Sequence, residues 1–177
     1  VFVIYTLICA VLIGISWDEI YYHKLGKINL NYLLSFGSIN EDFYSKYRYS
    51  TLYWSFSSLL TQLAPQTFNL EFHHIINSIF GLLTVVAVYK ITKKLFNTVI
   101  AKFATIFLLL LPFFFGHFAI NNKDIIITFS HFWIIYYLIK YATKKLIGLK
   151  RIIIVLKISI LSAIGTGIQL MFFGSLL

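Results

Sequence analysis

The sequence predicts an all-α integral membrane protein, and three observations support this fold class. Of its 177 residues, 59% are hydrophobic and 12% are charged, whereas about 25% of a typical soluble chain is charged. The mean hydropathy is +0.84. The apolar residues also form runs close to the about 20 residues that a helix needs to cross a bilayer. We therefore expect a polytopic bundle of transmembrane helices.

Five apolar segments are the candidate spans, because roughly 17–25 residues can cross the hydrocarbon core. They are 1–16, 74–91, 102–120, 125–139 and 152–170. The chain starts with Val and stops inside an apolar run, so we expect one membrane domain over residues 1–177 that is the N-terminal part of a longer protein. The remainder would follow Leu177.

The only long loop joins the first two spans and covers residues 17–73. Two parts of it, 28–36 and 49–63, carry apolar and aromatic residues at three-to-four spacing. This spacing predicts helices that lie in the plane of the membrane interface. In the second of them, Tyr53, Trp54 and Phe56 are expected to form an aromatic face turned towards the lipid.

Charge placement predicts the orientation, since Lys and Arg concentrate in short cytoplasmic loops. Basic residues flank the connections near residues 90–102 and 140–151, and we place both inside. All six acids then fall on the other side with five basic residues, which leaves ten of the fifteen basic residues inside. Although the net charge is +9, its distribution between apolar runs does not predict a nucleic-acid partner. The protein is expected in a bacterial inner membrane, or in the endoplasmic reticulum if it is eukaryotic.

Two polar groups are predicted to meet at the non-cytoplasmic face. The pair Asp18-Glu19 follows the first span, and the turn Asn121-Asn122-Lys123-Asp124 precedes the fourth. The N-termini of the second and fourth spans lie at the same face, where their dipoles favour an anionic group such as a phosphate. We therefore expect Asp124 to lie close to Asp18 across a cleft.

The order of these features resembles the GT-C glycosyltransferases, and within them the branch of protein O-mannosyltransferases and aminoarabinose transferases. The resemblance runs over the whole chain and rests on residues spread along it: Asp18, Glu19, His73, His74, Pro112, Gly116, His117, Asn121, Lys123 and Asp124. It implies an enzyme that transfers a sugar from a polyprenyl-phosphate donor to a hydroxyl of a protein, lipid or polysaccharide, with inversion. The piece alone is expected to be inactive.

The resemblance also implies roles for particular residues. Asp18 is the candidate general base, Glu19 supports it, and Asp124 completes the catalytic set. Phosphate and substrate are expected to bind the basic and polar residues nearby: Lys46, Arg48, His73, His74, His117, Asn121 and Lys123.

Other interpretations of the same residues stay open. Ser16-x-x-Glu19 fits a capping box for a helix that starts at Trp17, and Asn122 and Asp124 are good N-cap residues for the fourth span. The acids and histidines offer mixed carboxylate and imidazole ligands, but their spacing does not require a metal, so no cofactor is certain and a divalent metal stays possible. A transporter or channel subunit and a non-catalytic scaffold are the alternative functions.

Overall fold

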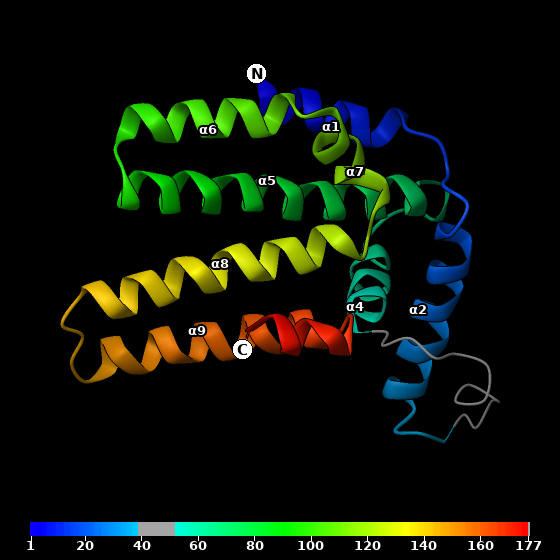
Figure 1. Cartoon of the computed structure of the whole chain (residues 1–177). Helices are drawn as coiled ribbons and strands as arrows, with labels where there is room; N and C mark the ends of the chain where they lie inside the picture. The colour runs from blue at the N-terminus through cyan, green and yellow to red at the C-terminus, as the bar shows by residue number, and fades with distance from the viewer. Residues whose placement is uncertain (39–51, 177) are drawn as a thin grey trace.

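The computed structural model describes residues 1–38 and 52–176, and within them the regular elements are helices. Five helices lie along one another and form a bundle, with α5 in contact with α1, α6 and α8, and α9 in contact with α8 (Figure 1). Their bounds are α1 (Phe2–Leu12), α5 (Asn69–Leu95), α6 (Thr98–Leu110), α8 (Asp124–Thr143) and α9 (Leu149–Thr166). This confirms the predicted all-helical fold class for the described residues.

Two elements in this part of the chain are long and apolar enough to cross a membrane. One is α5 with the short 3₁₀ helix η1 (Gln66–Phe68) before it, and the other is α8. A third span is formed if α6 and α7 (Pro112–Ile120) are counted together. Helix α1 is apolar but has only 11 residues, and the 18 residues of α9 include Lys150, Arg151 and Lys157. The expected five spans are therefore not confirmed.

The segment predicted as one span over 102–120 is a bent pair of helices. Helices α6 and α7 meet at Leu111, and their axes differ by 65°. Pro112 is the first residue of α7, where its missing N–H costs no helical hydrogen bond and its fixed φ suits the first turn. Because the residue before a proline is driven out of the α region, Leu111 adopts extended backbone and α6 ends there.

Helices α2 (Glu19–Leu34) and α4 (Leu52–Thr61) run across one end of the bundle instead of along it (Figure 1). They cross at Gly26, where a Cβ atom would lie 2.5 Å from the Trp54 carbonyl oxygen. The rings of Tyr22 and Trp54 stack beside this crossing with their centroids 4.2 Å apart. Both helices were expected in this loop, although α2 is longer than the predicted segment 28–36 and starts at Glu19, not at Trp17.

The predicted aromatic face of α4 divides between two environments. Trp54 is 2% exposed and packs on α2, and Tyr53 is buried with its hydroxyl donating to Asn77 Oδ1 on α5 at 3.1 Å. Phe56 is 45% exposed. The expectation that all three face the lipid was wrong, because α2 covers one side of α4 and a single sequence pattern cannot show which of two apolar neighbours a helix contacts.

The two basic connections lie at the opposite end of the bundle from α2 and α4 (Figure 1). One joins α5 to α6, and the other joins α8 to α9. The short 3₁₀ helix η2 (Leu170–Leu176) then follows α9 and packs back on it. The fold thus separates a basic end from an end that carries α2, α4 and the start of α8.

Candidate active site

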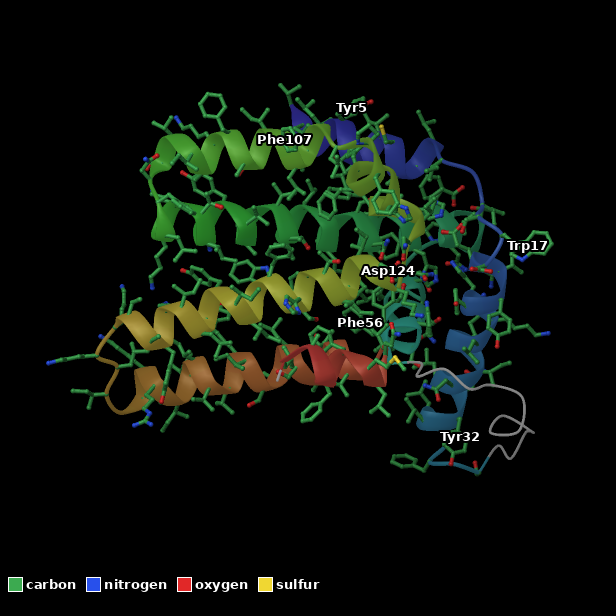
Figure 2. The ribbon with its side chains drawn as sticks, viewed as in Figure 1. Tyr5, Trp17, Tyr32, Phe56, Phe107 and Asp124 are labelled. Atoms are coloured by element: carbon green, nitrogen blue, oxygen red, sulfur yellow. The ribbon has the colours of Figure 1, made fainter. Side chains whose placement is uncertain are left out.

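A cavity of about 320 Å³ lies between the start of α2 and the turn that joins α7 to α8. Asp18, Glu19 and Tyr22 line it on one side, and residues about a hundred positions further along the chain line it on the other: His117, Ile120, Asn121, Asn122, Lys123 and Asp124. Trp17, which is 96% exposed, points away from the helices, while Asp124 lies at the start of α8 (Figure 2). The two groups of residues that the sequence predicted to meet share one cavity.

The Asp18 carboxylate lines this cavity and does not cap α2. Asp18 is exposed and occupies the N-cap position of α2. A capping side chain would accept a hydrogen bond from a backbone N–H one turn into the helix. In the described part of the chain, the Asp18 side chain makes no such bond. Asp18 is therefore placed as a solvent-accessible carboxylate, and the start of α2 depends on its neighbour instead.

Glu19 is buried and ties three segments together. Its Oε2 atom accepts the backbone N–H of Ser16 at 2.6 Å, which is one half of the expected capping box. Its Oε1 atom lies 2.7 Å from His74 Nε2, and His74 Nδ1 lies 3.1 Å from the carbonyl oxygen of Ala10. The carbonyl can only accept, so Nδ1 carries a hydrogen and one proton is held between Nε2 and Oε1. The backbone on both sides of Asp18 is thereby fixed to α1 and α5.

Two opposing effects act on the pKa of the Glu19 carboxyl. Burial raises it, because the charged form loses its hydration. The hydrogen bonds with His74 and with the Ser16 N–H act in the other direction and together outweigh burial, so the pKa is lower than its ordinary value. Glu19 is therefore an ionised acceptor that holds the site together.

The turn before α8 is organised by the side chain of Asn121. Its Oδ1 atom accepts the backbone N–H groups of Asp124 at 2.8 Å and Lys123 at 3.3 Å. Its Nδ2 atom donates to Asp124 Oδ2 at 2.9 Å and lies 2.7 Å from His117 Nδ1. The start of α8 is thus capped by Asn121, and neither Asn122 nor Asp124 takes the capping role considered for them.

The remaining predicted site residues do not line this cavity in the described chain. His74 is 1% exposed and contacts Glu19 from α5. His73 is also buried, with its Nδ1 atom against the Ser57 hydroxyl and its ring centroid 3.7 Å from that of His23 on α2. Burial lowers the pKa of His23 to about 4. Lys46 and Arg48 lie outside the described residues.

Sequence reasoning missed the contribution of Tyr22 to the cavity wall and of His23 to the buried cluster. The spacing from Asp18 to Tyr22 is one helical turn, so a helix starting at Asp18 places both on one face. The sequence spacing could therefore have predicted the position of Tyr22, whereas nothing in the sequence pairs His23 with His73.

No group of three or more His, Cys, Asp or Glu side chains that could hold a metal ion occurs within residues 1–38 and 52–176. Glu19 and His74 are already hydrogen-bonded to each other, and Asp124 to Asn121. The side chains considered as a mixed ligand set are therefore not assembled as one in this part of the chain.

The described residues form a helical bundle with candidate membrane spans and a polar cavity at one end that Asp18, Glu19 and Asp124 help to line. A model of the dolichyl-phosphate-mannose-protein mannosyltransferase family matches residues 52–168. The chain therefore belongs to this family, which places it among the membrane glycosyltransferases and agrees with the resemblance found in the sequence. No curated protein matches the chain, and no solved structure matches it.

Proposed function

We propose that the full-length protein transfers a sugar from a polyprenyl-phosphate donor to a hydroxyl acceptor. The reaction takes place in the cavity that Asp18, Glu19 and Asp124 line, which is called the acidic cavity below. The observation that carries this proposal is the position of Asp18. Its carboxylate is exposed in a cavity shared with Asp124, and capping does not use it. Family membership supports sugar transfer over the alternatives of a transporter, a channel subunit or a scaffold.

In the proposed reaction, the acceptor oxygen attacks the anomeric carbon while the bond from that carbon to the phosphate oxygen breaks. The acceptor proton moves to the Asp18 carboxylate, and the lipid phosphate leaves with the electron pair. A positioned general base contributes about 10²–10⁴-fold. Attack from the side opposite to the phosphate inverts the configuration of the sugar.

The other residues have supporting roles in this proposal. Glu19 and His74 hold the backbone that carries Asp18, so we assign them positioning roles. Asn121 orients Asp124, because the Asn121 side-chain amide donates a hydrogen bond to Asp124 Oδ2. Lys123 supplies positive charge in the cavity wall, where it can stabilise the charge that develops on the leaving phosphate.

The test is an Asp18→Asn variant of the full-length protein, assayed in membranes for sugar transfer from a polyprenyl-phosphate donor. The change keeps the size of the side chain and its ability to cap a helix, but removes basicity. We expect transfer to fall by about 10²–10⁴-fold.

Glu71→Gln is the matched control, because Glu71 is an acid in the first turn of α5 and is not among the cavity-lining residues. It should retain the parent rate at matched expression. Transfer by Asp18→Asn at the parent rate would falsify the assignment of the base.

A further inference from the structure

His117 lines the acidic cavity and has no role in the reaction proposed above. It lies half-buried in the last turn of α7, and its ring is tilted against that of Phe113 with the centroids 4.6 Å apart. Its Nδ1 atom lies 2.7 Å from the side-chain nitrogen of Asn121. Each nitrogen of a neutral imidazole can donate or accept, depending on where the hydrogen is. The chemistry that His117 offers to a substrate therefore depends on which ring nitrogen carries this hydrogen.

The hydrogen bonds of Asn121 determine the position of that hydrogen. Asn121 Oδ1 accepts the backbone N–H groups of Lys123 at 3.3 Å and of Asp124 at 2.8 Å. A backbone N–H can only donate, so a rotated amide would place its own NH₂ group against two donors. The atom beside His117 is therefore the amide nitrogen, which can only donate. His117 Nδ1 must accept from it, and the neutral ring carries its hydrogen on Nε2.

The Nε2–H group of His117 is available to a ligand. In the described part of the chain, His117 Nε2 has no hydrogen-bond partner, and it is not one of the buried polar atoms that lack one, unlike Nε2 of His73. It is therefore an accessible donor on a side chain that lines the cavity. Because Nδ1 accepts from Asn121 and Nε2 already carries a hydrogen, the neutral ring has no free lone pair for a proton. His117 is accordingly a hydrogen-bond donor and not a general base.

The stereochemistry of the proposed transfer indicates which group this donor contacts. In an inverting displacement, the attacking oxygen and the leaving group lie on opposite faces of the sugar. Asp18 lies on the α2 side of the cavity, whereas His117 and Lys123 come from the α7–α8 side. Asn121 holds both of them, because its Oδ1 atom accepts the Lys123 N–H and its amide donates to His117. The two donors therefore lie on the side opposite to the base, where the phosphate must leave.

We propose that His117 Nε2–H donates a hydrogen bond to the phosphate of the sugar donor, and that Asn121 is the residue that positions it. This inference rests on the proposed function. The electron pair of the breaking bond goes to the phosphate oxygen, so the phosphate gains negative charge as it leaves. A hydrogen bond to an oxygen that gains charge is stronger in the transition state than in the ground state, and such a bond raises the rate. His117 keeps its own proton throughout.

The first experiment locates the ring hydrogen without any substrate. Full-length protein with isotopically labelled histidine is studied by magic-angle-spinning NMR at alkaline pH, which shows which nitrogen of each neutral ring carries a hydrogen. The resonances that disappear in His117→Gln identify His117. We expect Nε2–H in the parent and Nδ1–H in Asn121→Asp, because the new carboxylate oxygen beside Nδ1 can only accept. Asn122→Asp is the matched control, since it adds the same charge to the same turn and should keep the parent tautomer. Nδ1–H in the parent would overturn the proposal.

The second experiment measures sugar transfer by the full-length protein in membranes. His117→Leu removes the donor and should lower kcat by about 10–100-fold with little change in KM, as expected for one hydrogen bond to a charged group. His117→Gln keeps an N–H group near the Nε2 position and should recover most of the rate. His131→Leu is the matched control and should keep the parent rate, because His131 packs against Phe172 and is not among the cavity-lining residues.

The two experiments separate this proposal from the assignment of the base. A raised KM at unchanged kcat in His117→Leu would show a contact that does not strengthen in the transition state, and parent kinetics would show no contact. Either result overturns the proposal. If Asp18→Asn keeps the parent rate while His117→Leu lowers kcat, only the assignment of the base fails. If Asp18→Asn loses transfer while His117→Leu retains it, only the role of His117 fails. Circular dichroism and size-exclusion profiles verify that each variant is folded.

Discussion

At the scale of single residues, the two acids of the Asp18-Glu19 pair have different environments. Asp18 is exposed in the cavity, whereas Glu19 is 2% exposed and hydrogen-bonded to Ser16 and His74. The sequence predicted a leading role for Asp18 and a supporting role for Glu19. It could not predict the partner of Glu19, because His74 is 55 positions away and its neighbour His73 has the same side chain.

His74→Leu should destabilise the protein, because it leaves the Glu19 carboxylate buried without its partner. Removing one partner of a buried hydrogen bond leaves the other polar group unsatisfied, which costs about 1–3 kcal/mol and more when that group is charged. Thermal unfolding of the detergent-solubilised protein measures the loss. His131→Leu is the control, since His131 packs edge-on against the ring of Phe172 and should cost less. Equal losses in both variants would show that the Glu19–His74 pair adds no special stability.

At the scale of elements, α2 is positioned across the end of the bundle mainly by its packing on α4. Each helix could be predicted from apolar spacing, but their crossing could not, because it depends on the absence of a side chain at Gly26. The burial of Trp54 follows from this crossing. The aromatic pattern of α4 is compatible with a membrane surface, but in the structure Trp54 packs on the neighbouring helix α2.

Gly26→Ala should open this crossing, since the new methyl group would lie 2.5 Å from the Trp54 carbonyl oxygen and 2.6 Å from Ser58 Oγ. Overpacking of this kind costs about 1–3 kcal/mol. Gly116→Ala in α7 is a matched control, because no atom lies within 4 Å of the position that its new methyl group would take and alanine favours a helix by about 1 kcal/mol. Thermal unfolding should therefore move in opposite directions for the two variants, and a shift in the same direction would contradict the close approach.

The packing of α2 also predicts a pH dependence of stability. Burial lowers the pKa of His23 to about 4, whereas an unperturbed histidine has a pKa of about 6.5. Between these values the unfolded chain binds a proton that the folded protein does not, so the free energy of unfolding falls as the pH is lowered through this window. The full effect is up to about 3 kcal/mol.

His23→Gln should reduce this dependence, but not abolish it, in unfolding experiments between about pH 6.5 and pH 4.5, because the buried His73 imidazole that contacts His23 stays in place. The contribution of Glu19 does not interfere, because its pKa is lowered from an acidic starting value and its stabilisation is lost only below this window. Lys24→Gln, at the next position of α2, should keep the pH dependence of the parent. A parent-like slope in His23→Gln would contradict the inferred burial of a neutral imidazole.

At the scale of the whole molecule, charge is separated along the bundle. The two basic connections lie at one end, and the acidic cavity lies at the other (Figure 1). The all-helical fold and the order of its elements could be predicted because apolar runs and charge clusters are local signals. The number of spans could not be settled in the same way, because Pro112 divides one apolar run and three basic residues interrupt another.

The orientation in the membrane stays a prediction, and cysteine labelling in a Cys9→Ser background tests it. Ser38→Cys and Asn122→Cys should react with a membrane-impermeant reagent from the non-cytoplasmic side, and Lys145→Cys only from the cytoplasmic side. Asn122 is preferred to Asn121, whose amide holds the turn. Labelling of Ser38→Cys or Asn122→Cys from the cytoplasm would reverse or refute the topology.

Because of the bend at Pro112, the length of α7 sets the distance and the rotation between the end of α6 and the turn before α8. Its nine residues make about two and a half turns, and each residue advances the helix by about 100°. Side chains on its exposed side can vary, because Phe113 is 76% exposed and Gly116 has open space beside it, whereas Phe118 is buried. The number of residues in α7 cannot change, since one insertion between Pro112 and His117 would rotate His117 and Asn121 together away from Asp18. The geometry of the acidic cavity therefore depends on the number of residues in α7 as well as on their identity.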